Sequence, residues 1–220
     1  MKNIILSLAI GAMAIGPAIA QPQDISKVNG SVTAEAGQEY GKLSTVNGSV
    51  RIEADATVGA ASTVNGAISI ADGARASGLE TVNGAVRAGD RVEVSGDIET
   101  VNGAITFGQG SRIGGDVGTV NGQIKLVGTE VNGGIKTVNG GVDLGPGTRV
   151  DGDLTVAEAP RRLISWGSRE NRTPTIIIGP DSEVRGRLVF KREVELHVHE
   201  SARIGEVEGA QPQRFSGDRP

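Results

Sequence analysis

The sequence has no cysteine and very few aromatic side chains, and both absences narrow the choice of fold. Without cysteine the chain has no disulfide, no thiol nucleophile and no thiolate metal site. Aromatic residues make up 2% of the chain, although a globular core of this size usually relies on them for buried area. Val, Ile and Leu must therefore fill the core, which suits a narrow column better than a rounded core.

Histidine is also scarce, and the chain has no excess of positive charge. The net charge of −4 gives no electrostatic case for a nucleic-acid partner. The two histidines, His197 and His199, would share one outward strand face with Glu195. Imidazole and carboxylate groups in this arrangement can bind a divalent cation, but no ligand set of recognised spacing accompanies them, so we interpret them as solvated side chains. We expect no metal and no cofactor.

Residues 1–20 have the pattern of a secretory signal peptide. Lys2 precedes an apolar run from Ile4 to Ile15, and Ala18-Ile19-Ala20 fits a cleavage site for small residues. No later apolar run approaches the length of a membrane span, so we expect no transmembrane segment after cleavage. The sequence therefore predicts an exported protein, periplasmic or extracellular.

A tetrapeptide, Thr-Val-Asn-Gly, recurs along the chain at a nearly constant interval. It begins at Thr45, Thr63, Thr81, Thr100, Thr119 and Thr137, and a degenerate copy begins at Lys27. Its asparagines are separated by steps of 18, 18, 18, 19, 19 and 18 residues. Such a fixed period is typical of a solenoid built from stacked, near-identical coils.

A finer period of six residues divides each coil into three sides. Steps of six from Val46 reach only aliphatic residues as far as Val94, through Ile52, Val58, Val64, Ile70, Ala76, Val82 and Ala88. We expect these residues to point inward, so that Thr and Asn of each tetrapeptide point outward. The pattern predicts an all-β, single-stranded parallel β-helix, triangular in section, with about 18 residues per coil. A left-handed hexapeptide helix fits the same pattern, but the usual hand of parallel crossovers favours a right-handed coil.

Each Asn-Gly is interpreted as a corner of the coil, because no antiparallel hairpin pattern surrounds it. Stacked corners would bring equivalent asparagines together, and their amides would form a ladder along the column. The predicted ladder consists of Asn29, Asn47, Asn65, Asn83, Asn102, Asn121 and Asn139.

The rhythm stops at Pro160 and returns at Thr175. We expect coils over 21–159, a loop insertion over 160–174, further coils over 175–209 and a disordered tail over 210–220. The loop contains the one tryptophan of the chain and four arginines, which makes it a candidate binding site for an acidic glycan, a headgroup or a protein. Its candidate residues are Arg161, Arg162, Trp166, Arg169 and Arg172.

Several of these segments resemble known families. The repeated segment from Thr45 to Ile52 resembles bacterial secreted adhesin-type β-repeat proteins, and the runs at 94–98, 147–154 and 178–186 are similar to the bactofilins, a polymer-forming cytoskeletal family. The resemblance covers about residues 28–158 and 175–209. It implies a right-handed triangular β-helix and, from the bactofilins, end-to-end polymers. The signal peptide and the Arg/Trp loop depart from the bactofilin pattern.

No nucleophile or catalytic ligand set is marked in the sequence. Asp97, Asp116, Asp151 and Asp153 recur with the repeat, so we interpret them as corner residues and expect no enzyme activity. We expect a structural or adhesion-type protein of the cell envelope that self-associates through the N-terminal end of its column, with Tyr40 covering part of that end. The alternative is a binding module for a repetitive extracellular polymer such as a glycan, using the Thr/Asn face or the Arg/Trp loop.

Overall fold

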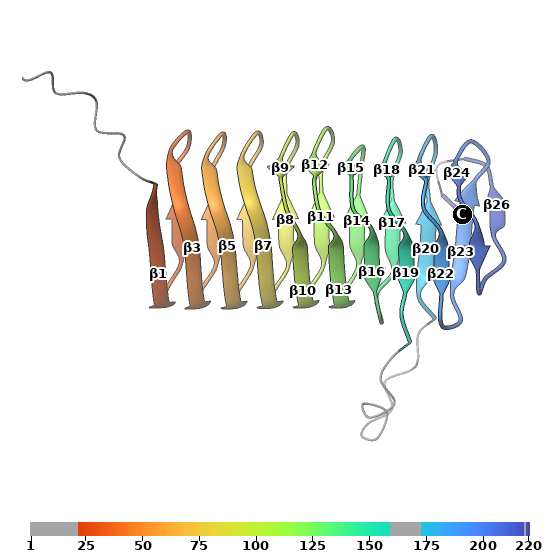
Figure 1. Ribbon diagram of the computed structural model, residues 1–220, viewed down its shortest axis with the longest axis horizontal. Coiled ribbons are helices and arrows are strands. Elements are labelled where there is room, and N and C mark those ends of the chain that lie inside the picture. Colours follow the sequence, from red (N-terminus) through yellow and green to blue (C-terminus); the bar gives the residue numbers. More distant parts are fainter. Residues whose placement is uncertain (1–21, 159–172, 218) are drawn as a thin grey trace, which may run out of the picture.

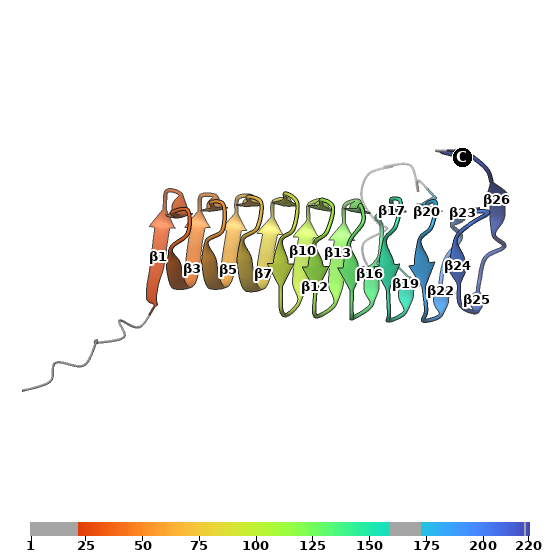
Figure 2. The same cartoon turned by 90° about the horizontal axis from the view of Figure 1, so that it is seen from above.

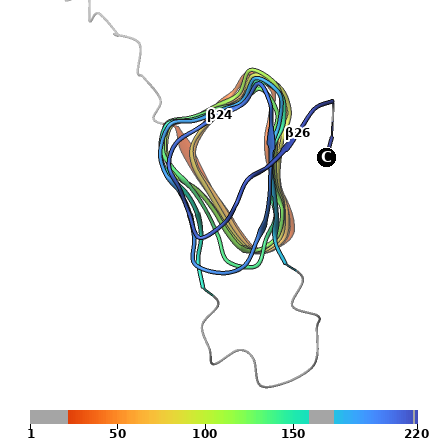
Figure 3. The same ribbon diagram turned by 90° about the vertical axis from the view of Figure 1, so that its right-hand side faces the viewer.

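The computed structural model describes residues 22–158, 173–217 and 219–220, and this part of the chain is a parallel β-helix (Figure 1). Ten coils follow one another along a straight column, and every paired strand is parallel to its neighbours. No helix occurs among the described residues. Viewed along the column, the coils share a three-sided outline, as predicted (Figure 3). The predicted signal peptide and nearly all of the predicted loop lie outside the described residues.

One side of the column is a sheet of ten short strands, one from each coil. Seen from above, the coils succeed one another along the length of the column (Figure 2). Most of these short strands have three residues, so that two side chains point inward and the central one points outward. The strands are β2 (Val32–Ala34), β4 (Val50–Ile52), β6 (Ile68–Ile70), β8 (Val86–Ala88), β11 (Ile105–Phe107), β14 (Ile124–Leu126), β17 (Val142–Leu144), β20 (Thr175–Ile178), β23 (Glu195–His199) and β26 (Gln213–Phe215).

The other two sides share a second sheet. In the first coils one long strand runs over both sides; these strands are β1 (Gln23–Asn29), β3 (Glu39–Asn47), β5 (Thr57–Asn65) and β7 (Arg75–Asn83). In later coils the two sides have separate strands. One side has β9 (Glu93–Val94), β12 (Arg112–Ile113), β15 (Glu130–Val131), β18 (Arg149–Val150), β21 (Glu183–Val184) and β24 (Arg203–Ile204). The other has β10 (Ile98–Asn102), β13 (Val117–Asn121), β16 (Ile135–Thr137), β19 (Leu154–Val156), β22 (Leu188–Phe190) and β25 (Val207–Glu208).

One added residue separates the long strands from the split ones. Ala76 pairs with Val94, a step of 18, whereas Leu79 pairs with Ile98, a step of 19. The extra residue is accommodated in the corner segment 95–97, which ends in Asp97. The Asp97 carboxylate accepts a hydrogen bond of 2.8 Å from the backbone N–H of Asp116 in the next coil. At this corner a carboxylate accepts the backbone hydrogen bond that a paired strand would otherwise accept. The extra residue of the corner accounts for the 19-residue step from Asn83 to Asn102.

The core is a thin column of aliphatic side chains, and two of its three sides follow the predicted six-residue frame. Ile52 and Val58 are buried, as are their equivalents Ile70 and Ala76 in the next coil. The frame is wrong on the third side. Val46 is 39% exposed, whereas Thr45 beside it is 4% exposed. On that side the inward residues are Leu43 and Thr45, so the strand faces the core one residue out of the predicted register.

The C-terminal segment is also ordered beyond the predicted end of the coils. Gln213–Phe215 forms β26, which pairs with β23, and Phe215 packs edge-on against His199 at 5.2 Å between ring centres. The segment between β25 and β26 crosses the outline of the column (Figure 3), and Ala210 within it packs against the core. The prediction of a disordered tail is therefore wrong for residues 210–217, because this segment covers the last coil instead of leaving it.

Candidate binding face and column ends

The most unusual surface is a straight file of valines on the side formed by β10, β13, β16 and the second halves of β1, β3, β5 and β7. We call this side the valine face. Val28, Val46, Val64 and Val101 are 66%, 39%, 40% and 39% exposed, and they are all the large hydrophobic residues exposed in the described part of the chain. The complete file is Val28, Val46, Val64, Val82, Val101, Val120 and Val138. A contiguous apolar stripe of this kind is typical of an interaction surface.

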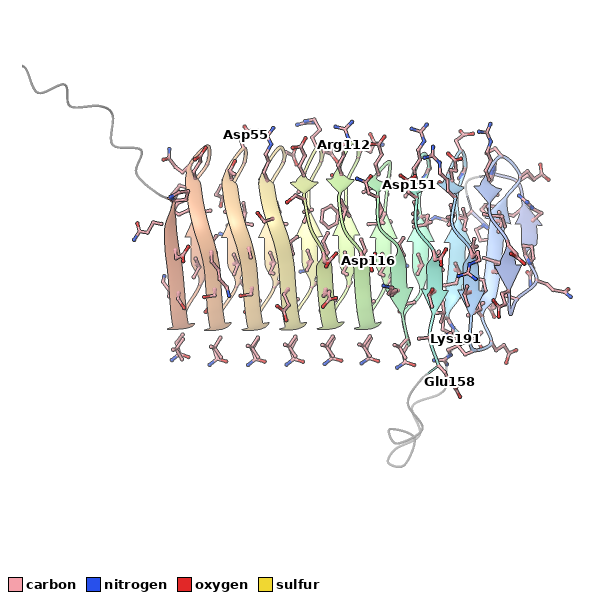
Figure 4. The ribbon with its side chains drawn as sticks, viewed as in Figure 1. Asp55, Arg112, Asp116, Asp151, Glu158 and Lys191 are labelled. Atoms are coloured by element: carbon pink, nitrogen blue, oxygen red, sulfur yellow. The ribbon has the colours of Figure 1, made fainter. Side chains whose placement is uncertain are left out.

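A groove of about 360 Å³ runs along the valine face. Its valine wall is formed by Val82, Val101, Val120 and Val138, and its opposite wall by Glu80, Glu99, Gly118 and Lys136. The threonine of each strand lies between the two walls. Because inward and outward residues alternate along a strand, the threonine points inward and its two sequence neighbours point outward on either side of the groove. The groove reaches Ala157, next to Glu158, where the described chain leaves the column (Figure 4).

The polar wall carries two carboxylates without a cation and one ion pair. Glu80 and Glu99 lie directly opposite each other on neighbouring strands, and no ion pair involves either of them within the described residues. Like charges in this position repel. Lys136 instead pairs with Asp116.

The Asp116–Lys136 pair has shifted pKa values in the directions expected of an ion pair. The hydrogen bond from Lys136, followed by the one from the backbone N–H of Gly134, lowers the pKa of the Asp116 carboxyl. The hydrogen bond to Asp116 raises the pKa of the Lys136 ammonium. The side chain of Lys136 is 65% exposed and that of Asp116 is 40% exposed, so solvent screens the pair and its contribution to stability is small.

The threonines of the tetrapeptide point into the column. Five of the six hydroxyls donate a hydrogen bond of 2.8–3.1 Å to the glycine carbonyl of the Asn-Gly corner in the preceding coil. The donors are Thr45, Thr63, Thr81, Thr100 and Thr119, and the acceptors are Gly30, Gly48, Gly66, Gly84 and Gly103. The hydroxyl of Thr137 instead contacts its own corner, where it accepts a hydrogen bond of 3.1 Å from the backbone N–H of Gly140. The predicted outward array of Thr and Asn is therefore wrong in its threonine half, because the threonine side chains are buried and five of them donate to these corner carbonyls.

The asparagines form a continuous hydrogen-bonded ladder along an exposed corner. Each Nδ2 donates to the Oδ1 of the asparagine in the preceding coil over 2.8–3.1 Å. The ladder contains Asn29, Asn47, Asn65, Asn83, Asn102, Asn121 and Asn139. At its C-terminal end Arg192 donates to Oδ1 of Asn139 over 2.7 Å. At its N-terminal end the ladder stops at Asn29.

The two ends of the column differ: the N-terminal end is open, whereas the C-terminal end is covered. At the N-terminal end β1 and β2 each pair with one strand only. Tyr40 is half-buried there, and its hydroxyl lies 3.4 Å from the backbone N–H of Glu35. Lys27 takes the place of the tetrapeptide threonine, and its Nζ donates to the carbonyl of Ser31 over 2.8 Å. The C-terminal end is covered by the segment that leads to β26.

The predicted corner aspartates accept hydrogen bonds from the following coils. Asp97 and Asp116 accept from backbone N–H groups, and so does Asp153, from Arg187 over 2.8 Å. Asp151 accepts from the Arg185 side chain over 2.9 Å. These contacts use the carboxylates to hold the coils together, which is the corner role expected from their repetition.

The remaining candidate residues form no recognised site in the described part of the chain. His199 Nδ1 lies 2.9 Å from Oγ of Ser201, a local contact two residues away. Among the described residues no group of three or more His, Asp or Glu is placed to hold a metal ion. Arg161, Arg162, Trp166, Arg169 and Arg172 lie outside the described residues.

The valine file was missed as a surface because Thr and Val are both β-branched and nearly equal in size. The signal that identifies the outward register lies two residues earlier. Glu80, Glu99 and Lys136 share the strand parity of the tetrapeptide valine, and a narrow apolar core excludes their charges.

Comparison with known proteins adds no relative to this picture. No family model, no curated protein and no solved structure matches the chain. In the described residues, no helix is long and apolar enough to pass through a membrane.

Proposed function

We propose that the chain is an exported, non-enzymatic β-helix with a structural or adhesion-type role in the cell envelope, where it self-associates through the N-terminal end of its column. One observation carries this proposal: β1 and β2 keep the register of the later coils, yet each has a strand on one side only. An unpaired strand edge is a template for a further strand. The covered C-terminal end makes the N-terminal end the expected contact.

Particle length in solution tests the end contact. Ten coils spaced by about 4.8 Å give a column of roughly 48 Å. Small-angle scattering over a concentration series should show a maximum dimension that grows beyond the length of one chain. Ile25→Lys adds a charge to the half-buried inward position of β1 and should suppress the growth. Val28→Lys in the same strand points sideways into solvent and should not.

A particle length that stays constant up to the highest concentration, or that responds equally to both variants, contradicts the end contact. Export is tested separately. Mass spectrometry of the protein from the producing cell's periplasm or medium should give a chain that begins at Gln21. Retention of the intact N-terminus in the cytoplasm would count against export.

The alternative function is a binding module for a repetitive extracellular polymer such as a glycan. The exposed asparagine ladder favours it, because this ladder offers amide groups at the fixed spacing of the coils. Binding of glycans to an array, lost on Trp166→Ala or on replacement of Asn83 and Asn102 by Ala, would support this alternative.

A further inference from the structure

The valine face lacks a partner, although its side chains form a pattern that is complementary to itself. Four consecutive coils place Glu80, Glu99, Gly118 and Lys136 in one file, connected by strand pairing. The file is acidic at its N-terminal half, has a gap at Gly118 and is basic at Lys136. Beside it runs the valine file, which in these four coils consists of the exposed Val101 and the half-buried Val82, Val120 and Val138.

We propose that two copies of the chain pack face to face on their valine faces, with their columns antiparallel. The two copies are related by a twofold axis. This axis runs parallel to the strands and passes between the coil of Glu99 and the coil of Gly118. Such an axis reverses the order of the coils and keeps each side chain at its position along the strand. Val101 of one copy then faces Val120 of the other, and Val82 faces Val138, so the four valines of the groove are covered by valines of the second copy.

The same axis compensates the charges. It places Glu80 opposite Lys136 of the second copy, and it does so twice because the contact is symmetric. Lys136 already pairs with Asp116 through one of its three N–H donors, so donors remain for a second carboxylate. Glu80, which repels Glu99 within one chain, thereby acquires a cation from the second copy.

The axis also matches shape. Glu99 of one copy lies over Gly118 of the other, the position of the file that has no side chain. A Cβ at Gly118 would meet only Cγ of Glu99 at 4.0 Å, so the position is open. A second copy has the same coil spacing along its whole length, which a partner of unrelated structure lacks.

The contact is small, which determines how it has to be measured. Strand rise and spacing give roughly 500 Å² of flat sheet per copy, below the roughly 800 Å² per partner of a standard stable interface. We therefore expect a reversible dimer with a Kd in about the micromolar range. Sedimentation velocity of the purified protein from about 1 to about 300 µM covers that range.

A charge exchange provides the decisive test. Glu80→Lys and Lys136→Glu should each weaken the dimer at least about tenfold, because each places like charges in contact. The double variant restores both pairs and should return Kd to within about threefold of the original. Lys125→Glu makes the same charge change outward on β14, on another side of the column, and should leave Kd unchanged.

Two further variants test the apolar stripe and the gap. Val101→Glu and Gly118→Leu change exposed or open positions, so the fold should persist, and each should weaken the dimer at least about tenfold. Ile25→Lys at the column end should leave Kd unchanged, which separates this contact from end-to-end association. A protein that is monomeric at about 300 µM, a double variant that remains weak, or a Val101→Glu variant with unchanged Kd would overturn the proposal.

Discussion

At the residue scale, the tetrapeptide assigns opposite roles to two side chains of almost the same shape. The Thr81 hydroxyl is buried and donates to the carbonyl of Gly66 over 3.0 Å, whereas Val82 beside it lines the outer groove. A hydroxyl is tolerated in the core because a corner carbonyl of the preceding coil accepts its proton. The repeated Thr therefore reflects a hydrogen bond from a buried hydroxyl to a corner carbonyl in coil after coil, and the repeated Val reflects one continuous outer surface.

The first prediction at this scale is that Thr81→Val destabilises the protein. The substitution keeps the volume but leaves the Gly66 carbonyl without the hydroxyl donor, at an expected cost of about 1 kcal/mol. Urea denaturation followed by circular dichroism measures this change. Thr106→Val, at the outward position of β11, is the matched control and should change stability little. Equal midpoints for Thr81→Val and the unchanged protein would show that the hydroxyl is dispensable.

At the element scale, the coil is held by glycines of two kinds. At the Asn-Gly corners glycine allows close approach: a Cβ on Gly84 would lie 1.8 Å from the carbonyl oxygen of Gly66. At another corner the backbone has positive φ, with Gly73 at 72° and Asp55 at 59° in equivalent positions. The first kind admits no side chain, whereas the second admits one at the cost of strain.

We therefore predict that Gly84→Ala is severely destabilising. The added methyl group meets the backbone of the preceding coil, which cannot shift without separating two rungs, and we expect a loss of at least about 3 kcal/mol. Thermal unfolding of the variant measures it. Gly118→Ala, on a strand where the new methyl group has open space, is the control and should retain the original stability. If both variants unfold together with the original protein, the corner is more plastic than its contacts indicate.

How far the sequence predicts these elements depends on what each pattern measures. The period of 18 and its division into three sides follow from repeated spacing, so the parallel β-helix could be predicted, as could the asparagine neighbours. The inward register of the third side could not be read from Val46 and Thr45 alone, because both favour strands. Only the charges at Glu80, Glu99 and Lys136 separate the two registers. Residues 213–215 were missed because three residues among Gly and Pro give no periodic signal.

At the scale of the whole molecule, the column is an array of repeated contacts with two unlike ends. Arg192 caps the asparagine ladder at Asn139, and the segment leading to β26 covers the core at the C-terminal end of the column. The other end has two unpaired edges, but it also has Lys27 where later coils have threonine. A charge in an inward position of an edge strand is a known protection against edge-to-edge association. The end contact should therefore be weaker than the stacking of coils within the chain.

Lys27→Thr tests this last point, since it restores the tetrapeptide in the first coil. Lys27 occupies the register of an inward threonine, but its side chain is exposed at the open end of the column. Removal of the ammonium group takes this charge away from the edge of β1, so end-to-end association should begin at a protein concentration at least about tenfold lower. Small-angle scattering should then show long particles at lower protein concentration than for the original chain. Lys125→Thr removes the same charge from β14 and should leave the particle length unchanged. If Lys27→Thr shortens the particles, the ammonium group of Lys27 itself makes the end contact. In that case its Nζ would donate to the neighbouring copy in place of the carbonyl of Ser31.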